Sequence, residues 1–508
     1  MKAFNRFFAL TLALILLASL ALPAAADDSA PETAATTYTI TIDKNEAGRV
    51  YHAYQIFTGD ISTEELTNVK WGDGISSAGI SALCTLFSLD PATATANNVA
   101  QEITTEADAK DAADTLASSN GLTNASNFQF QNGTYVLSGL EPGYYMIVDD
   151  TVLGENANSS LSAYMMRLVK SVTVTPKDSV PKLEKKVSDI NDSLQATHDT
   201  HLESADYDIG DTVPFHIHIT LGTNIDQYES YEIVVTDTMS EGLTYLGNMS
   251  VKYGTHDLDP SCYQVTTPVT NADKTSSFTI VFSDLYQMKD TSGNSVVPHA
   301  GGNLLINYDA TLNEKAVIGS NGNINTASMT FSNNPNGEGT GKTPDDSAVV
   351  FTYQLNVNKV DQDENPLVGA EFTLYKNDIN GEWHAINRFT TNADASSFSF
   401  TGLDDGEYKL VETKTPIGYN TIEDMEFEIV AGHNTALDTL TGNKVNGQIE
   451  LTVSKDTGIL STTVVNEKGA TLPSTGGIGT TIFYVAGGLL VCVAIVLLVT
   501  KKRMNIEE

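Results

Sequence analysis

Short segments in which apolar and polar residues alternate recur along the chain, and they constrain its fold more than any other feature. Examples are Tyr38–Ile42, Phe215–Ile219, Ile233–Val235 and Leu355–Val357. Successive side chains of a strand point to opposite faces, so each segment places its apolar residues on one face. Gly, Asn and Asp punctuate the segments, which favours β-sandwiches over alternating strand-helix units. The sequence therefore predicts a mainly β protein made of tandem Ig-like β-sandwich domains.

The alternating segments fall into three groups, in agreement with the roughly three domains that a chain of 508 residues suggests. We place the N-terminal domain at 37–176, the second at 180–345 and the third at 350–468. Residues 77–118 are rich in alanine and polar side chains, which predicts a helical insertion in the first domain. A stretch of turn-forming residues at 333–339 ends the second domain.

The N-terminus has the pattern of a secretory signal peptide. Lys2 and Arg6 precede an apolar run, and three consecutive alanines end at Ala26. A basic start, an apolar centre and small residues at the end are the features that signal peptidase accepts. We therefore predict a signal peptide at 1–26, with cleavage between Ala26 and Asp27.

A second apolar stretch, Ile478–Val499, lies near the C-terminus and is followed by Lys501, Lys502 and Arg503. As a helix this stretch would be about 33 Å long, which is enough to cross a hydrocarbon core of about 30 Å. Basic residues beside a span remain cytoplasmic, so the domains are expected on the outside of the membrane.

A pentapeptide stands directly before this apolar stretch: Leu472, Pro473, Ser474, Thr475 and Gly476. The pentapeptide, the span and the basic tail together resemble the LPXTG cell-wall sorting signal of Gram-positive surface proteins. The resemblance implies that a sortase cleaves between Thr475 and Gly476 and holds the threonine as a thioester, which an amine resolves. Residues 472–508 are thus expected to anchor the chain in the membrane transiently, before it joins the cell wall.

The cysteines give little support for a disulfide framework. Of the three, Cys492 lies in the apolar stretch, and Cys84 and Cys262 fall in different predicted domains. Exported proteins commonly use disulfides for stabilisation. An exported chain of this size must then be stabilised in another way, which motivates a search for a different covalent cross-link.

Three polar residues are expected to face the core of the third domain. Lys359 has the same parity as Leu355 and Val357, and the alternation places Glu412 and Asn466 on the inward faces of two other strands. A lysine on an apolar face is costly unless it is neutral or paired. A buried Lys359–Glu412 salt bridge would account for two of these residues but not for the amide.

The motifs around these residues resemble the Cna B-type domain of sortase-assembled pilins. They are Lys359-Val-Asp, Gly369-Ala-Glu-Phe-Thr-Leu-Tyr, the box from Gly406 to Tyr419, and Asn466-Glu-Lys. The resemblance implies an intramolecular isopeptide bond between Lys359 and Asn466, assisted by Glu412. Burial should lower the pKa of the lysine and raise that of the acid, giving a nucleophilic amine and a proton shuttle.

The second domain repeats this arrangement with different residues. Lys185 and Asp237 have inward parity, and the segment that starts at Asp237 resembles the acid box of the second domain of backbone pilins, a Cna A-type fold. The closing strand offers Asn325 or Asn333, and the family pattern favours Asn325. Judged by strand parity alone, Asp211 is an alternative to Asp237 as the acid of this site.

The first domain is expected to lack a cross-link. Lys44 follows Ile40 and Ile42 at inward parity, but the predicted final strand, from Arg167 to Thr175, contains neither Asn nor Asp. An isopeptide acceptor is therefore missing from the place where the other two domains have one.

A lysine for joining subunits is expected after the first domain. The segment Val172–Lys177 resembles the pilin motif that normally ends Val-Tyr-Pro-Lys, although Thr175 replaces the tyrosine. The resemblance implies that Lys177 attacks the thioester of a neighbouring copy. Lys170 and Lys182 are the alternatives.

Other classes of function find little support. The formal net charge of −36 disfavours nucleic acid as a partner. His216 and His218 are expected to face solvent without binding a metal, and Asp361–Asn365 is expected to be a polar hairpin. No motif of a turnover enzyme is found, and no cofactor or metal is expected.

The resemblance implies the major shaft subunit of a covalent pilus at the cell surface, with a role in adhesion. The expected partners are a pilin-polymerising and a housekeeping sortase, other copies of the chain, accessory pilins, peptidoglycan and a host surface ligand. A monomeric wall-anchored adhesin and an accessory or basal pilin are the alternatives.

Overall fold

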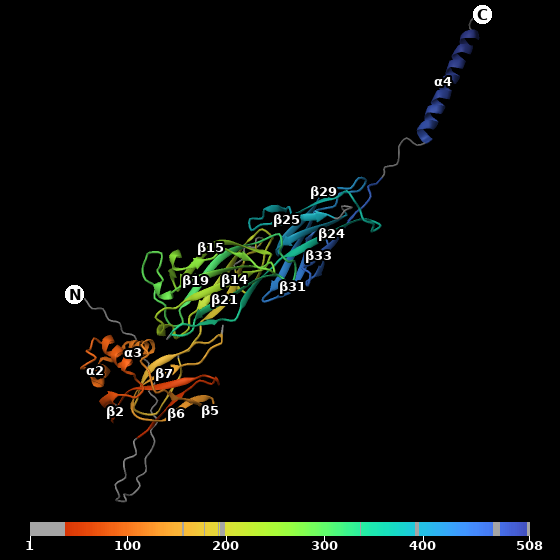
Figure 1. The fold of residues 1–508 in the computed structure, drawn as a ribbon. Helices are drawn as coiled ribbons and strands as arrows, with labels where there is room; N and C mark the ends of the chain where they lie inside the picture. Colours follow the sequence, from red (N-terminus) through yellow and green to blue (C-terminus); the bar gives the residue numbers. More distant parts are fainter. Residues whose placement is uncertain are drawn as a thin grey trace.

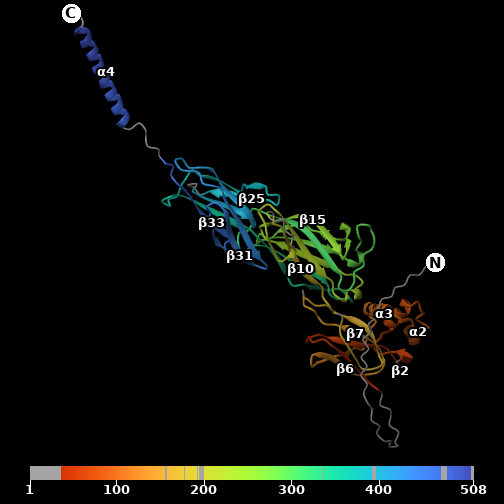
Figure 2. The ribbon, with the colours of Figure 1, turned by 180° about the vertical axis from the view of Figure 1, so that it is seen from behind.

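The computed structural model describes residues 36–63, 65–154, 157–176, 178–191, 193, 199–335, 337–391, 396–470 and 478–504. Strands are the commonest regular structure in these residues and pair mainly antiparallel. Three sheet-rich bodies follow one another in chain order (Figure 1). The view from behind shows the same order (Figure 2). The predicted mainly β fold is confirmed.

Two sheets form the first body, with strand orders β5-β6-β1-β9 and β3-β2-β7-β8, and β4 pairs with β2. The strands are β1 (Tyr38–Ile42), β2 (Tyr51–Ser62), β3 (Glu65–Trp71), β4 (Ser126–Asn127), β5 (Gln129–Gln131), β6 (Thr134–Leu140), β7 (Gly143–Asp149), β8 (Ala163–Leu168) and β9 (Val172–Val174). The first and last strands, β1 and β9, pair in parallel.

The predicted helical insertion is confirmed as three helices between β3 and β4. They are α1 (Ser77–Leu86), α2 (Ala96–Glu102) and α3 (Glu106–Ser118). Each begins after a serine or threonine whose side chain accepts a hydrogen bond from a first-turn N–H group, which satisfies a donor that the helix leaves free. Leu83, Val99 and Leu116 are buried in one cluster with Ile56 and Phe57 of β2.

The second body is a sandwich of two larger sheets, with orders β11-β10-β13-β20-β15-β16 and β12-β23-β21-β14-β19-β17. Strands β18 (Val269–Thr270) and β22 (Thr340–Lys342) pair with β19 and β21. The other strands are β10 (Lys182–Asp189), β11 (Asp199–Leu202), β12 (Ser204–Asp206), β13 (Thr212–Thr220), β14 (Ile233–Met239), β15 (Leu243–Tyr253), β16 (His256–Asp257), β17 (Gln264–Val265), β19 (Ser276–Phe282), β20 (Asn303–Leu312), β21 (Asn323–Ser332) and β23 (Asp346–Phe351).

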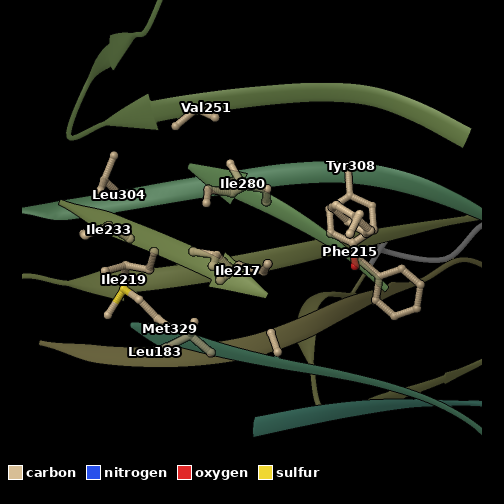
Figure 3. Close-up of a cluster of buried hydrophobic side chains, with 14 of the residues drawn as sticks. Leu183, Phe215, Ile217, Ile219, Ile233, Val251, Ile280, Leu304, Tyr308 and Met329 are labelled. Carbon is tan, nitrogen blue, oxygen red and sulfur yellow. The ribbon is translucent and has the colours of Figure 1, made fainter. Parts of the chain in front are cut away.

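The core of this body lies between its sheets. Ile217 and Ile219 of β13 face Ile233, Ile280 and Met329 of the opposite sheet, as Figure 3 shows. All of these side chains are fully buried, as the alternation along their strands predicts.

The third body consists of sheets with the orders β27-β28-β24-β33-β32 and β26-β25-β29-β30-β31. The strands are β24 (Tyr353–Asp361), β25 (Glu371–Asn377), β26 (Trp383–Ile386), β27 (Phe389–Thr391), β28 (Ser397–Leu403), β29 (Gly406–Lys414), β30 (Met425–His433), β31 (Leu437–Asn446), β32 (Thr452–Ser454) and β33 (Ile459–Asn466). First strand β24 and last strand β33 pair in parallel, in the centre of one sheet.

The boundary between the second and third bodies differs from our expectation. Strand β23 (Asp346–Phe351) pairs with β12 and β21, so the second sandwich extends beyond residue 345 and past residue 350. Only Thr352 separates β23 from β24. The apolar alternation continues across this junction, and the sequence therefore contains no turn that marks it.

A buried polar cluster joins these two bodies. Lys376 Nζ of β25 lies 2.6 Å from Asp208 Oδ2 and 3.3 Å from Asp404 Oδ2. Asp404 is fully buried, and this burial raises its pKa well above the ordinary value, against the opposing effect of Lys376. His433 of β30 contacts Asp206 with 3.4 Å between Nε2 and Oδ1. The junction therefore depends on cations from the third body.

Helix α4 (Ile478–Met504) contains the predicted C-terminal span. The helix is long and apolar enough to cross a membrane over Gly479–Arg503, where an 18-residue window has a mean hydropathy of 2.9. The helix makes no buried contact with the sheets in the described part of the chain.

The junction cluster yields a stability prediction. Lys376→Met should destabilise the protein at pH 7 by about 3–5 kcal/mol, because it leaves the buried carboxylates without their cation. The loss should shrink as the pH falls below 7, because burial already raises the pKa of Asp404 well above its ordinary value and protonation removes its uncompensated charge. Calorimetric unfolding of residues 27–475 measures both effects.

The matched control is Lys414→Met. Lys414 pairs with Glu371, but both side chains are 61% exposed, and such pairs contribute no more than about 1 kcal/mol. Equal effects of the two substitutions would contradict the role given to Lys376.

Candidate functional site

The three residues expected at the third-domain site are buried on three strands. Lys359 lies on β24, Glu412 on β29 and Asn466 at the end of β33. Lys359 and Asn466 are 0% exposed and Glu412 is 6% exposed. Strand alternation explains this burial, because Leu355 and Val357 on the face of Lys359 are core residues.

The acid in this site contacts the amide. Asn466 Nδ2 donates a hydrogen bond to Glu412 Oε2 at 3.0 Å and another to the carbonyl of Asn420 at 2.7 Å. Glu412 Oε2 also accepts hydrogen bonds of 3.2 Å from Thr415 Oγ1 and from the Ile422 backbone N–H. These contacts fix the carboxyl group against the nitrogen that an isopeptide reaction must expel.

The amine of Lys359 lies beside backbone carbonyls. Its Nζ donates to Val360 O at 2.9 Å and to Val464 O at 3.0 Å. Among the described contacts there is no Lys359–Glu412 ion pair within 4.0 Å, as a simple buried salt bridge would require. Burial lowers the pKa of Lys359 to about 8, against the opposing charges of Glu412 and Asp361. A substantial fraction of this amine is therefore neutral near pH 7 to 8.

The second-domain site lies between the two sheets of its sandwich. Lys185 of β10, Asp237 of β14 and Asn325 of β21 are all 0% exposed. Lys185 Nζ lies 2.6 Å from Asp237 Oδ2. Burial lowers the pKa of Lys185, which Asp237 opposes by favouring the charged amine.

Tyr308 of β20 connects these three residues, and our sequence analysis missed it. Its hydroxyl accepts hydrogen bonds from Lys185 Nζ and, at 2.7 Å, from Asn325 Nδ2. It donates to Asp237 Oδ2 at 2.7 Å. Its inward parity between Ile306 and Ala310 was available from the sequence. The sequence did not reveal that β20 pairs between β13 and β15, which is what brings Tyr308 to this end of the core.

The structure separates the alternatives for this site. Asn333 follows the end of β21, eight residues beyond Asn325, which corresponds to about 26 Å of extended strand. Met239 pairs with Asn325, close to Asp237, whereas Ile233 pairs near Asn333 at the other end of β14. Asp211 lies just before β13 and is partly exposed. Asp237 therefore contacts Lys185 directly, and Asn325 is connected to Lys185 through the Tyr308 hydroxyl.

In the first domain, the expected inward orientation of Lys44 is wrong. Strand β1 ends at Ile42, and the side chain of Lys44 is 23% exposed, in ion pairs with Asp178 and Glu46. The chain leaves the sheet before the alternation reaches Lys44. The expected final strand is also interrupted, since it forms β8 and β9 separately.

Several predicted residues lie outside the described part of the chain. They are the linkage residue Lys177, the sorting pentapeptide 472–476 and the signal cleavage position at Ala26 and Asp27. Of the alternatives to Lys177, Lys170 lies in the exposed turn between β8 and β9, and Lys182 is exposed at the start of β10.

The two histidines of β13 do not simply face solvent. His216 bonds Asn307 at 2.7 Å and Ser188 at 2.8 Å, and its ring stacks on that of His201. His218 lies 2.6 Å from His201. Burial lowers the pKa of both β13 histidines, so a neutral polar cluster covers this face of the sheet.

Groups with the composition of metal ligands occur elsewhere. The described residues include Asp189 with Asp206 and His433, Asp206 with Asp404 and Asp405, and Asp378 with Glu382 and His384. The first two groups belong to the junction cluster, where Lys376 and His433 provide positive charge. The segment Asp361–Asn365 forms a turn in which the Asp361 carboxylate accepts backbone N–H groups.

Comparisons with known proteins agree with these observations. The SpaA prealbumin-like fold domain family matches residues 353–444, and the LPXTG cell wall anchor motif matches residues 464–505. The chain is 28% identical over 403 residues to the trypsin-resistant surface T6 protein of Streptococcus pyogenes serotype M6, which covers 65% of this chain and 70% of that protein.

Similar solved structures include two pilins. The T6 backbone pilin of serotype M6 Streptococcus pyogenes matches with a TM-score of 0.50 and 19% identity, covering 86% of this chain and all of that one. The full-length major pilin SpaD of Corynebacterium diphtheriae matches with a TM-score of 0.46 and 16% identity, covering 85% and 98% of the two chains. The first match shows that this chain shares the fold of the T6 pilin.

Proposed function

We propose that this chain, a wall-anchored surface protein of the Gram-positive sortase-assembled pilin type, is the major structural subunit of a covalently polymerised pilus. The observation that carries the proposal is the repeated burial of a lysine, an acid and an asparagine in two successive sandwich domains. A shaft under tension needs such covalent reinforcement in every subunit. Adhesion and colonisation would follow from display of the shaft at the cell surface.

In the third domain, Lys359 would bond to Asn466. The neutral amine attacks Cγ of Asn466, and the carbonyl electrons move to Oδ1. One proton of the attacking nitrogen passes through Glu412 to Nδ2, and ammonia leaves as the carbonyl re-forms. The contact of 3.0 Å between Glu412 and Nδ2 supports this role of the acid. Positioning within one core supplies the effective concentration, so the chain needs no external enzyme.

In the second domain, Lys185 would bond to Asn325 with Asp237 as the shuttle. The contact of 2.6 Å between Lys185 and Asp237 supports this assignment. In each domain the reacting lysine lies on an early strand, β10 or β24, and the asparagine on a late strand, β21 or β33. Each bond would therefore enclose most of its domain, leaving little chain to extend under load. Each reaction would occur once per molecule, so the chain would not act as a turnover enzyme. It would instead be a substrate of sortase.

Polymerisation would use the two ends of the ectodomain. Sortase would cleave after Thr475 and transfer that carbonyl to Lys177 of the next copy. A head-to-tail contact of this kind does not close on itself and produces a filament. A pilin-polymerising sortase, a housekeeping sortase, accessory pilins, peptidoglycan and a host ligand would be the further partners. The C-terminal helix has an 18-residue window with a mean hydropathy of 2.9. This supports an intermediate that is held in the membrane by this helix before sortase acts.

The intramolecular bonds predict a change in mass. Recombinant residues 27–475 should be lighter than the sequence mass by two ammonia molecules, about 34 Da, and Glu412→Ala should restore about 17 Da. Glu407→Ala is the control, because Glu407 lies on the same strand but on its outer face. An unmodified wild-type mass would contradict the cross-links.

The lowered pKa of Lys359 predicts a pH dependence for the third-domain bond. The reactive species is the neutral amine, whose fraction falls about tenfold per pH unit below a pKa of about 8. Chain that is recovered unfolded, before the bond has formed, should therefore form it more slowly when refolded at pH 6 than at pH 8. Measurements of intact mass over time would record the two rates. Equal rates at the two pH values would show that deprotonation of Lys359 does not limit the reaction.

Polymerisation predicts a role for one lysine in cells that contain the partner sortase. Lys177→Ala should abolish high-mass ladders of the surface protein on immunoblots, whereas Lys182→Ala should leave them unchanged. Ladders that persist in Lys177→Ala would assign the linkage to another amine. A single band for the wild type would favour the monomeric adhesin, and a band that enters polymers only with another pilin would favour the accessory subunit.

A further inference from the structure

We propose that Tyr308 is a catalytic residue of the second-domain cross-link, whose phenol carries a proton to the departing nitrogen of Asn325. This inference rests on the proposed reaction between Lys185 and Asn325. It assigns to the second domain a proton relay that the third domain does not use.

The hydrogen bonds around Tyr308 form a continuous route. Its hydroxyl contacts Lys185 Nζ, lies 2.7 Å from Asn325 Nδ2, and donates to Asp237 Oδ2 at 2.7 Å. Among the described contacts, Asp237 bonds the amine and the phenol but not the amide of Asn325. The phenol is thus the group that connects the acid to the nitrogen that must leave.

Aromatic packing holds the phenol in place. The ring of Tyr308 is stacked on that of Phe215 with 5.8 Å between centroids and is perpendicular to that of Phe278 with 5.3 Å between centroids. Figure 3 shows Tyr308 and Phe215 together at one end of the core. Lys185 Nζ lies 4.4 Å from the centre of the Tyr308 ring. Since Tyr308 is only 1% exposed, the surrounding side chains have to carry the proton without bulk water.

The two sites differ in how the acid is connected to the amide of the asparagine. In the third domain, Glu412 contacts the amide of Asn466 directly at 3.0 Å. In the second domain, the shorter side chain of Asp237 contacts the lysine instead. The hydroxyl of Tyr308 spans the remaining gap, which explains why a hydroxyl occupies an otherwise apolar position between Ile306 and Ala310.

The relay moves one proton from the attacking nitrogen of Lys185 to the departing nitrogen of Asn325. Lys185 and Asp237 share one proton, and the amine is neutral when the carboxyl holds it. Attack on Cγ forms the new C–N bond and moves the carbonyl electrons to Oδ1 of Asn325. Tyr308 gives its proton to Nδ2 and takes one from Asp237, which in turn takes one from the attacking nitrogen. The bond from Cγ to Nδ2 then breaks, ammonia leaves with the electron pair, and the carbonyl re-forms.

The test is Tyr308→Phe in residues 27–475, refolded from the unfolded state and followed by intact mass and peptide mapping. The third-domain bond should form at the wild-type rate, whereas the Lys185–Asn325 bond should form at least about 100-fold more slowly, as expected when general acid–base catalysis is lost. Tyr245→Phe is the matched control, because its ring packs 5.6 Å from that of Tyr308 in the same core. It should leave both rates unchanged.

A wild-type rate for the second bond in Tyr308→Phe would overturn the inference but leave the cross-link itself intact. Absence of the second bond in the wild type would instead overturn the proposed function of this domain. To separate catalysis from misfolding, Tyr308 can be replaced by 3,5-difluorotyrosine, which keeps the hydroxyl but makes it more acidic. The rate of second-bond formation should then differ from the wild-type rate while the third-domain rate stays the same, and an unchanged second-bond rate would also overturn the inference.

Discussion

The burial of a lysine amine beside an acid and an asparagine amide is the constraint on which the account of this molecule depends. Water would stabilise each of these groups, so placing them in an apolar core is costly unless they are paired or react. Lys185 and Lys359 are both 0% exposed, within two of the largest cores of the chain. A reaction that converts amine and amide into a neutral secondary amide would remove much of this cost.

This constraint connects the local chemistry with the architecture. Cys84, Cys262 and Cys492 are free, so the described structure contains no disulfide to reinforce its sandwiches. Cross-links between early and late strands would reinforce the second and third domains individually. The ionic cluster around Lys376 then holds these two domains together. The first domain lacks an equivalent buried triad among its described residues, and it precedes the lysine proposed for joining subunits.

Much of this organisation could be predicted from strand alternation. The parity of Lys359, Glu412 and Asn466 was sufficient to expect their burial, because a strand determines the orientation of each side chain locally. Tyr308 was missed because its role depends on which distant strands lie beside β20. The inward orientation of Lys44 was wrong because the strand ends first. Non-local pairing, which one sequence does not reveal, thus accounts for the missed role of Tyr308, and an early strand end accounts for the error at Lys44.

The likeness to pilins and the surface anchor agree with this account, and its cross-links can be observed directly. The most direct measurement is a high-resolution crystal structure of residues 27–475. The account predicts continuous electron density from Lys359 Nζ to Asn466 Cγ and from Lys185 Nζ to Asn325 Cγ, each at an amide bond length of about 1.33 Å. Separate side chains at hydrogen-bond or longer distances in both domains would contradict it.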